Sequence, residues 1–267
     1  MKTKLLIDFL KVLALFGGLW VAFTFIPWVP DEVSLEFPVD KEIELGEMIM
    51  ESTLKKPGFQ PLNNHLVDSA IWVISRRLED SLGLSDFDYR IVVVDNANVN
   101  AFAMPGGNIV VLSGLIAFSE SPEEVAAVIA HEMGHVELRH VTKRLVKELG
   151  LAVLFGVLTG TDGVVLSEIS RTVTSSYFDR KQEEEADEFA LDLVYRCGIN
   201  PRALGTLFRR IKSEYGSADM FEIINTHPAT SSRVKKSFEF EIGDDFESRP
   251  FDFDWEAIRA AVKAKES

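Results

Sequence analysis

His131-Glu132-Met133-Gly134-His135 lies within a stretch, Ser121 to about Gly150, that predicts one long helix. Ser121 is a typical N-cap, Pro122 suits the first turn because its missing N–H has no helical acceptor there, and Glu124 completes a capping box. The residues from Val125 to Ala130 are all apolar. They predict that the helix is buried and carries His131 into the interior.

The spacing of the two histidines is that of a zinc site. Residues four apart on a helix are offset by only about 40°, so His131 and His135 can each give a ring nitrogen to one ion. Glu132 projects beside them, where its carboxylate can hold a metal-bound water and take its proton. The alternative is an ordinary amphipathic helix. Gly134 favours the metal site, because a glycine inside a helix costs about 1 kcal/mol relative to alanine and indicates that another backbone approaches closely.

Two further positions limit the type of site. The three-histidine version of the motif is excluded, because Leu138 and Val141 stand where it needs Gly and His. His140 is five residues after His135 and faces another side of the helix. We therefore expect His140 to lie on the surface or to support a ligand, rather than to bind the metal itself.

A catalytic zinc site needs a third protein ligand. Glu183-Glu184-Glu185-Ala186-Asp187 begins a second predicted helix, from about Gln182 to Arg196. Glu183 and Asp187 are four apart on one face, so that one can bind the metal while the other holds a ligand histidine. Spacing alone does not choose between Glu183, Glu184 and Glu185. The alternative is a solvated acidic helix start, which the helix dipole favours.

Three short strands are predicted ahead of the metal helix. β-branched residues mark a strand at Tyr89 to Asp95, and two more follow at about Val99 to Met104 and at Asn108 to Leu112, on either side of a Pro-Gly-Gly turn. We expect a small, mostly antiparallel sheet beside the metal helix, in an α+β fold. Asn100-Ala101-Phe102-Ala103 is the expected substrate edge, where an extended peptide could add as another strand. An ordinary core strand is the alternative.

The N-terminus predicts a membrane anchor. Lys2, Lys4 and Lys11 precede an apolar run from Val12 to Val29, and these eighteen residues are just long enough to span a hydrocarbon core of about 30 Å. No small-residue cleavage site follows, so we expect the anchor to be retained. The lysines predict a cytoplasmic N-terminus and place the rest of the chain outside the cytoplasm.

Composition limits the partners. The net charge of −14 over 267 residues argues against nucleic acid, whose binding needs a basic face. Cys197 is the single cysteine, so neither an intrachain disulfide nor a cysteine zinc site is possible.

The remaining segments suggest how the chain is divided. Residues 31–60 predict a tether that passes into a short helix near 43–54, and residues 62–82 predict an amphipathic helix. The ten-residue apolar run Leu149–Leu158 is too short to span a bilayer. It predicts a core helix, with a flap resting on the membrane surface as the alternative. Further helices are expected at 227–240 and 255–265.

Four ordered motifs in residues 89–235 resemble the M48 family of zinc metallopeptidases. They are the strand and turn from Asn100 to Gly107, the His131–His135 motif, the Glu183–Asp187 motif, and His227-Pro228 with Arg233. The resemblance implies a mainly helical, zincin-like domain with one Zn²⁺ per chain. Together with the anchor and tether predicted from the N-terminal residues, it suggests a cytoplasmic stub and anchor (1–30), a tether (31–60), the peptidase domain (61–240) and a C-terminal helical extension (241–267).

The resemblance also implies roles for single residues. His131, His135 and Glu183 are implied as zinc ligands, with Glu132 as the general base and Asp187 supporting a ligand. The strand Asn100 to Ala103 is implied to bind substrate. His227 and Arg233 are implied to act in catalysis. For His227 two roles stay open: donating a hydrogen bond to the oxyanion of the tetrahedral intermediate, or closing the zinc site as a fourth ligand until substrate arrives.

The expected protein is a zinc endopeptidase on the cell inner membrane, single-pass, with its catalytic domain outside the cytoplasm (the periplasm in a Gram-negative cell). Multi-spanning members of the family carry further transmembrane helices, whereas only one segment here is long enough to span. The expected substrates are unfolded or mis-assembled envelope proteins. The alternative is a tethered chaperone or adaptor that binds extended chains and cuts little.

Overall fold

The computed structural model describes residues 37–160, 163–174, 178–214, 223, 226–227 and 231–263. The predicted anchor, Val12 to Val29, lies outside the described residues. Within the described part of the chain, no helix combines the length and the apolar character needed to cross a bilayer. The described residues belong to one compact unit that begins at Phe37.

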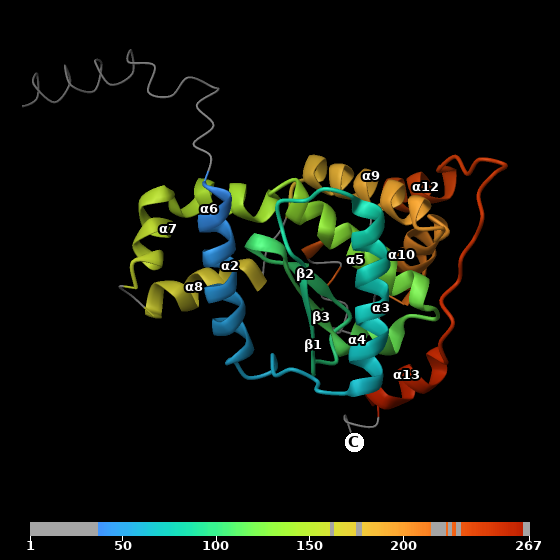
Figure 1. The fold of residues 1–267 in the computed structure, drawn as a ribbon, viewed down its shortest axis with the longest axis horizontal. Helices are drawn as coiled ribbons and strands as arrows, with labels where there is room; N and C mark the ends of the chain where they lie inside the picture. Colours follow the sequence, from blue (N-terminus) through green and yellow to red (C-terminus); the bar gives the residue numbers. More distant parts are fainter. Residues whose placement is uncertain are drawn as a thin grey trace, which may run out of the picture. The chain divides into compact units, whose positions relative to one another are not determined.

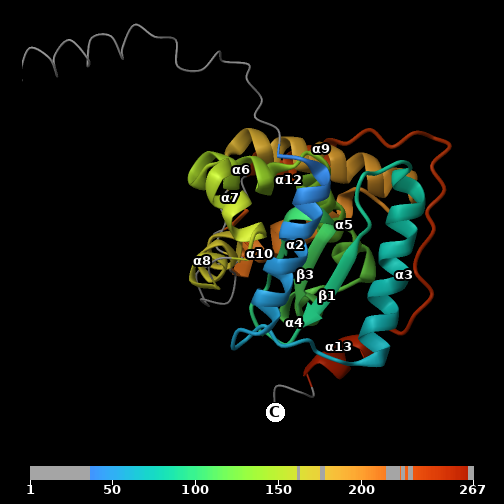
Figure 2. The same ribbon diagram turned by 60° about the vertical axis from the view of Figure 1, so that its left-hand side comes forward.

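Helices predominate, and they surround one small sheet (Figures 1 and 2). The elements are α2 (Val39–Leu54), α3 (His65–Leu82), β1 (Arg90–Val94), β2 (Ala101–Ala103), a 3₁₀ turn η1 (Pro105–Gly107), β3 (Asn108–Leu112), α4 (Ser113–Phe118), α5 (Pro122–Glu137), α6 (His140–Leu149), α7 (Leu151–Leu158), α8 (Gly163–Thr174), α9 (Arg180–Arg196), α10 (Arg202–Glu214), α12 (Ser231–Glu239) and α13 (Trp255–Lys263). The predicted class, mainly helical α+β, is confirmed.

The metal helix α5 forms the centre of the core. It packs on β2 and β3 of the sheet and also contacts α3, α9 and α10. The apolar residues that precede its first histidine are all buried, as their pattern predicts.

The long helix expected from Ser121 to Gly150 is wrong in its length. α5 ends at Glu137, Arg139 takes a left-handed conformation with φ 55°, and α6 starts at His140. The Arg139 side chain explains the break. Its Nε atom donates to Glu42 Oε2 on α2 at 2.6 Å, and it also donates to the carbonyl of Phe37. A partner far away in the sequence therefore fixes a backbone conformation that a non-glycine residue rarely adopts.

The predicted capping box of this helix is also wrong. Ser121 is the N-cap and Pro122 follows it, but the Ser121 side chain makes no capping hydrogen bond. Glu124 instead accepts a hydrogen bond from the backbone N–H of Glu120 at 2.8 Å and forms an ion pair with Arg210 of α10. The glutamate thus joins two helices as well as supporting the start of its own.

The sheet is mixed, with strand order β1-β3-β2. β2 and β3 form the expected antiparallel hairpin around η1, whereas β1 pairs with β3 in parallel. The chain leaves β1, passes over β3 to reach the far edge, and returns as β3 between the other two strands. β2 is therefore an edge strand, and it contacts the metal helix α5.

The ends of the described chain are more closely packed than a tether and an extension would be. Leu45, Ile49 and Met50 of α2 are fully buried, and a side chain at Gly46 would collide with the carbonyl of Pro105. At the other end, the Trp255 indole N–H donates to the carbonyl of Ser119 at 3.0 Å. α2 and α13 thus pack into the same compact unit as the rest of the described chain.

α7 departs from the expected core helix. Its eight residues are all apolar or glycine, yet only Leu154 and Val157 are buried. Phe155 is exposed and its ring lies 5.3 Å from that of Phe37. The next helix, α8, packs along α2. The hydroxyl groups of Ser170 on α8 and Thr53 on α2 form a hydrogen bond of 2.6 Å.

Candidate metal centre

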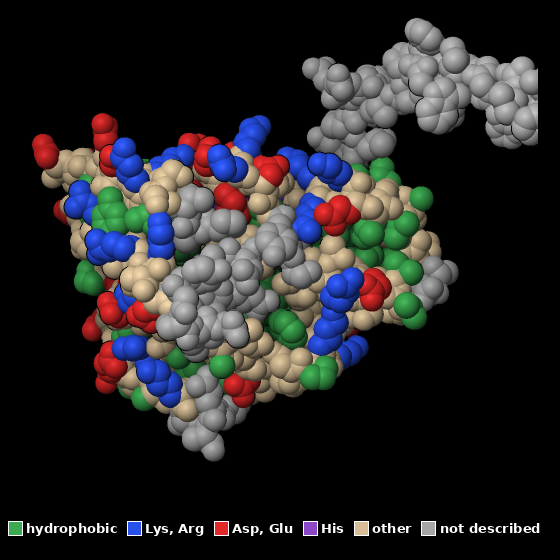
Figure 3. Space-filling model, turned by 180° about the vertical axis from the view of Figure 1, so that it is seen from behind, with side chains coloured by type: hydrophobic (Ala, Val, Ile, Leu, Met, Phe, Trp, Pro, Cys, Tyr) green, Lys and Arg blue, Asp and Glu red, His purple; other side chains and the backbone are tan. Residues whose placement is uncertain are grey.

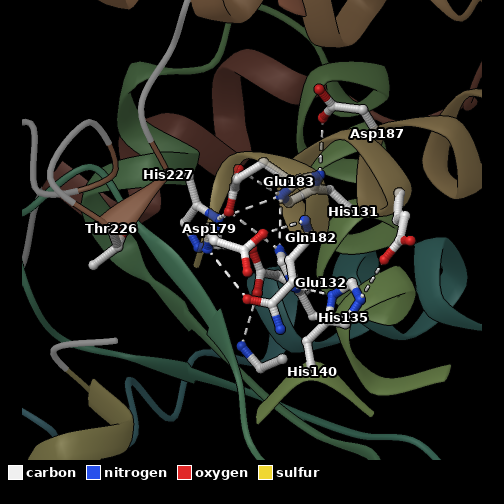
Figure 4. A network of polar contacts seen from close by, with 12 residues as sticks. His131, Glu132, His135, His140, Asp179, Gln182, Glu183, Asp187, Thr226 and His227 are labelled. Carbon is white, nitrogen blue, oxygen red and sulfur yellow. Dashed lines mark hydrogen bonds and ion pairs between the residues drawn. The ribbon is translucent and has the colours of Figure 1, made fainter. Parts of the chain in front are cut away.

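Three imidazoles and one carboxylate meet in the interior between α5 and α9 (Figure 4). His131 Nε2 lies 3.2 Å from His135 Nε2 and 3.3 Å from His227 Nδ1. Glu183 Oε1 is 3.5 Å from His135 Nε2, and its Oε2 is 3.6 Å from His131 Nε2. All four residues are buried, and their ligand atoms lie within 4.8 Å of one another.

Gly134 brings the two helices together. A Cβ atom at this position would lie 3.1 Å from both the Cα and the carbonyl oxygen of Ala186 on α9. The predicted reason for this glycine, close approach of another backbone, is confirmed. Gly134 lies between His131 and His135 in the sequence, and Ala186 lies between Glu183 and Asp187, so the contact joins the two helix segments that carry these residues.

The cluster fits a zinc ion. Nitrogen atoms of three imidazoles converge on one point, and hydrogen bonds among themselves cannot satisfy all of them, whereas a cation satisfies them together. Histidine nitrogen and carboxylate oxygen are donor types that Zn²⁺ prefers. Burial holds the pKa of His135 well below its ordinary value, which keeps that ring in the neutral form that a metal requires.

The orientation of α9 shows which of its three adjacent glutamates faces the cluster. Glu183 faces the cluster, Glu184 is exposed, and Glu185 points toward His140. Burial alone would raise the pKa of Glu183, but the charge of His227 and hydrogen bonds from His135 and His227 hold it well below its usual range. Glu183 is therefore a carboxylate that already faces three imidazoles.

Asp187 and Arg233 form a buried support behind this ligand set. Asp187 Oδ1 lies 3.1 Å from His131 Nδ1. Arg233 donates to both oxygens of Asp187, from Nε at 2.7 Å and from Nη2 at 2.8 Å, and its Nη1 lies 2.6 Å from Glu183 Oε2. Burial would raise the pKa of Asp187, but Arg233 and His131 lower it to about 2. These contacts make Arg233 a positioning residue rather than a group that faces the reacting atoms.

A second chain of contacts supports His135. Its Nδ1 lies 2.9 Å from His140 Nδ1, and His140 Nε2 lies 3.2 Å from Glu185 Oε2. If His135 gives Nε2 to the metal, its Nδ1 carries the proton and donates to His140, whose own proton then sits on Nε2 facing the carboxylate. One arrangement of protons therefore satisfies the whole chain.

Glu132 lies between the cluster and strand β2. Its Oε2 accepts a hydrogen bond from the backbone N–H of Ala103 on β2 at 2.8 Å. Its Oε1 has no hydrogen-bond partner among the described residues and lies 3.5 Å from His227 Nε2. Burial raises the pKa of Glu132, which suits a group that must accept a proton near neutral pH.

The outer edge of β2 is occupied by the chain itself. The N–H of Ala101 donates to the Asn100 side chain at 2.9 Å, while that of Ala103 binds Glu132. The carbonyl of Val99 accepts from the N–H of Ile223 at 3.2 Å. The side chain of Phe102 contacts Phe59 instead, with 6.1 Å between the ring centroids. Among the predicted substrate-binding residues, it is thus the backbone of Ala101 and Ala103 that borders the site.

One contributor to the site was not identified from the sequence, and the role of a second was left open. Phe178, just before α9, stacks on the His135 ring at 3.9 Å between centroids, and no local pattern marks it. His140 was expected to support a ligand or to lie on the surface, and the break at Arg139 turns it toward His135. A histidine immediately after the end of a metal helix is the one signal that could have indicated this contact.

Comparisons with known proteins agree with this geometry. The model of peptidase family M48 matches residues 67–239. Metalloprotease LoiP of Escherichia coli is 32% identical over 200 residues, which cover 72% of this chain and 77% of LoiP. Mitochondrial metalloendopeptidase OMA1 of Arabidopsis thaliana is 33% identical over 76% of this chain, and the beta-barrel assembly-enhancing protease of E. coli is 26% identical over 73%. The chain spans only 43% of the length of each of these last two relatives.

Proposed function

Because this chain belongs to peptidase family M48 and is a metalloprotease, we propose that it is a membrane-anchored zinc endopeptidase that hydrolyses unfolded or mis-assembled envelope proteins. The observation that carries the proposal is the place of Glu132. Its carboxylate bridges the backbone of β2 and the buried cluster of three histidines and Glu183. A peptide held along β2 would therefore present a carbonyl beside the cluster.

Different residues of the site would perform different steps of the hydrolysis. When bound, Zn²⁺ supplies polarisation of the scissile carbonyl and a lowered pKa for water. Glu132 takes the proton of the attacking water and passes it to the leaving amine. The outward carbonyl groups of Ala101 and Ala103 would accept hydrogen bonds from the substrate backbone, because their N–H groups already donate to Asn100 and Glu132. Such pairing requires only an extended chain and no particular sequence. Arg233 and Asp187 hold Glu183 and His131 in place.

The position of His227 supports a closed resting state. Its Nδ1 lies 2.8 Å from Glu183 Oε1 and 3.3 Å from His131 Nε2, so that it can complete four protein ligands. Ile223, four residues earlier, covers the carbonyl of Val99 beside β2. Ile223 thus blocks the strand and His227 closes the metal site. In this proposal the two residues leave these contacts on activation, and His227 then serves as the oxyanion donor.

Cleavage of unfolded casein by the full chain in vesicles tests the proposal. We expect hydrolysis that stops with a zinc chelator and returns with added Zn²⁺. The Glu132→Gln variant is the matched control, because it removes the base while leaving the ligands. Binding of casein without chelator-sensitive cleavage would favour the alternative, a tethered chaperone or adaptor.

The location is also part of the proposal. The apolar run Val12 to Val29 would form a single-pass anchor in the inner membrane, and the preceding lysines would keep the N-terminus in the cytoplasm. The envelope substrates are suggested by the name of the beta-barrel assembly-enhancing protease of E. coli. Protease added outside spheroplasts should digest residues beyond about 31 and leave a short protected stub. Protection of the catalytic region would refute this orientation.

A further inference from the structure

α7 is apolar around its whole circumference but lies largely in contact with solvent. Its sequence from Leu151 to Leu158 contains only aliphatic residues, one phenylalanine and one glycine, and only Leu154 and Val157 are buried. A helix that is hydrophobic on all sides is normally buried in a core or in a membrane. The surface of α7 that the protein leaves uncovered therefore points to an apolar neighbour outside the chain.

The start of α8 extends this surface. We call the exposed residues Ala152, Val153, Phe155 and Val164 the α7–α8 patch; the last three have exposed fractions of 38%, 40% and 72%. Three large hydrophobic residues outside the patch are also strongly exposed in the described part of the chain, Leu66, Trp72 and Leu84, and all of them lie on or just after α3. Figure 3 shows hydrophobic side chains gathered on the side formed by α7 and α8, with Lys and Arg side chains nearby.

We propose that the α7–α8 patch docks on the surface of a lipid bilayer. This inference rests on the proposed anchoring of the chain in a membrane, and it adds a second point of contact that the anchor alone does not provide. α7 and the first turn of α8 would lie at the boundary between headgroups and acyl chains, as interfacial helices with exposed apolar faces do.

The length of the chain places the patch within reach of the bilayer. The predicted anchor ends at Val29, and eight residues further on Phe37 lies against Phe155 of the patch, with ring centroids 5.3 Å apart. Eight residues span at most about 29 Å even when fully extended. The patch therefore stays within about one bilayer thickness of the point where the anchor leaves the membrane.

Charge distribution supports an anionic lipid surface. Acidic residues outnumber basic ones by fourteen in the whole chain, but residues 139–174 contain five Lys or Arg and only three Asp or Glu. Lys143 and Lys147 are exposed and lie four residues apart, on one face of α6 and directly before α7. Basic side chains next to an apolar face favour binding to anionic headgroups.

Docking would also fix the orientation of the catalytic site. α6 connects the patch to His140, which contacts the metal-ligand candidate His135. The site would then stay at a fixed distance from the membrane surface, which narrows the proposed substrates to chains near the bilayer.

The test uses the full chain in vesicles that contain anionic lipid and a lipid-attached spin-label quencher. In a Cys197→Ser background, Val164→Cys carries an environment-sensitive fluorophore. Leu84→Cys, at a residue that is fully exposed after α3, is the matched control. The probe at residue 164 should lose most of its fluorescence to the quencher, while the probe at residue 84 should keep it. The double variant Lys143→Glu with Lys147→Glu should show weaker quenching at residue 164.

Several results would overturn the inference. Absence of quenching at residue 164 would do so, and so would equal quenching at both sites. A blue-shifted emission without quenching would assign the patch to a protein partner, such as a second copy of the chain, instead of lipid. Undiminished quenching in the double variant would refute the inferred attraction between these two lysines and anionic lipid. Extraction with alkaline carbonate separates the two proposals: a chain that stays in the vesicles but is not quenched refutes only the docking, whereas a released chain refutes the anchor.

Discussion

Replacing Gly134 with alanine should weaken metal binding far more than it weakens the fold. The added Cβ would lie 3.1 Å from the Cα and carbonyl oxygen of Ala186, and 3.2 Å from Cδ1 of Phe189. Carbon atoms pack best at about 3.5–4.0 Å, so α5 and α9 must separate by about 0.4 Å at this point. Two of the three obstructing atoms belong to the backbone and cannot rotate away.

This separation acts directly on the cluster. His131 and His135 lie on α5, whereas Glu183 and Asp187 lie on α9, on either side of the contact. Metal–ligand distances tolerate deviations of only about 0.2 Å. We therefore expect zinc affinity to fall about 10- to 100-fold, the range seen when support of a metal ligand is lost.

The fold should change less, because two effects oppose each other. Alanine gains about 1 kcal/mol over glycine within a helix. Overpacking a core costs about 1–3 kcal/mol. The free energy of unfolding of the metal-free protein should therefore fall by only about 0–2 kcal/mol, which is the difference between these two ranges.

Two measurements on the same samples separate these effects. Zinc affinity is measured by competition with a chromogenic chelator, and stability by urea unfolding of the metal-free protein. Gly156→Ala is the matched control, since this glycine is also helical and a Cβ there meets nothing within 4 Å. It should gain about 1 kcal/mol and keep its zinc affinity. Unchanged zinc affinity in Gly134→Ala would refute the argument that this contact sets the ligand geometry.

Three further predictions concern the site. Glu132→Gln should retain zinc and lose hydrolysis by several orders of magnitude; loss of zinc, measured by elemental analysis, would contradict its role as a base rather than a ligand. Among the adjacent glutamates, Glu183→Gln should lose most of its zinc, Glu185→Gln should bind it about tenfold more weakly through the imidazole that it contacts, and Glu184→Gln should be unchanged. A different order in a chelator competition would show that the register on α9 is wrong. His227→Ala should raise casein cleavage if closure limits the rate, or lower kcat by about 10²–10³ with zinc retained if oxyanion stabilisation does; an unchanged rate would refute both roles.

The parts of the site that depend on one helix could be predicted from the sequence. His131, Glu132 and His135 share α5, so their relative positions follow from helix geometry alone. The choice of Glu183 could not be made in this way, because it depends on how α9 rotates against α5. That rotation is set by the contact of Gly134 with Ala186, which is a tertiary feature.

The same distinction between local and tertiary features applies to the fold. The hairpin of β2 and β3 follows from a local turn, whereas the parallel pairing of β1 with β3 joins segments that no local pattern connects. The break at Arg139 has no glycine or proline to mark it. It depends on Glu42, which lies 97 residues earlier in the chain.

The packing of α2 has a practical consequence for recombinant work. The region shared with the peptidase family begins at residue 67, after α2 has ended. A fragment cut there would expose η1 where Gly46 now rests against Pro105, and would deprive Arg139 of its carboxylate partner. We therefore expect a fragment for expression to need a start near Phe37, about thirty residues before the region that matches the family.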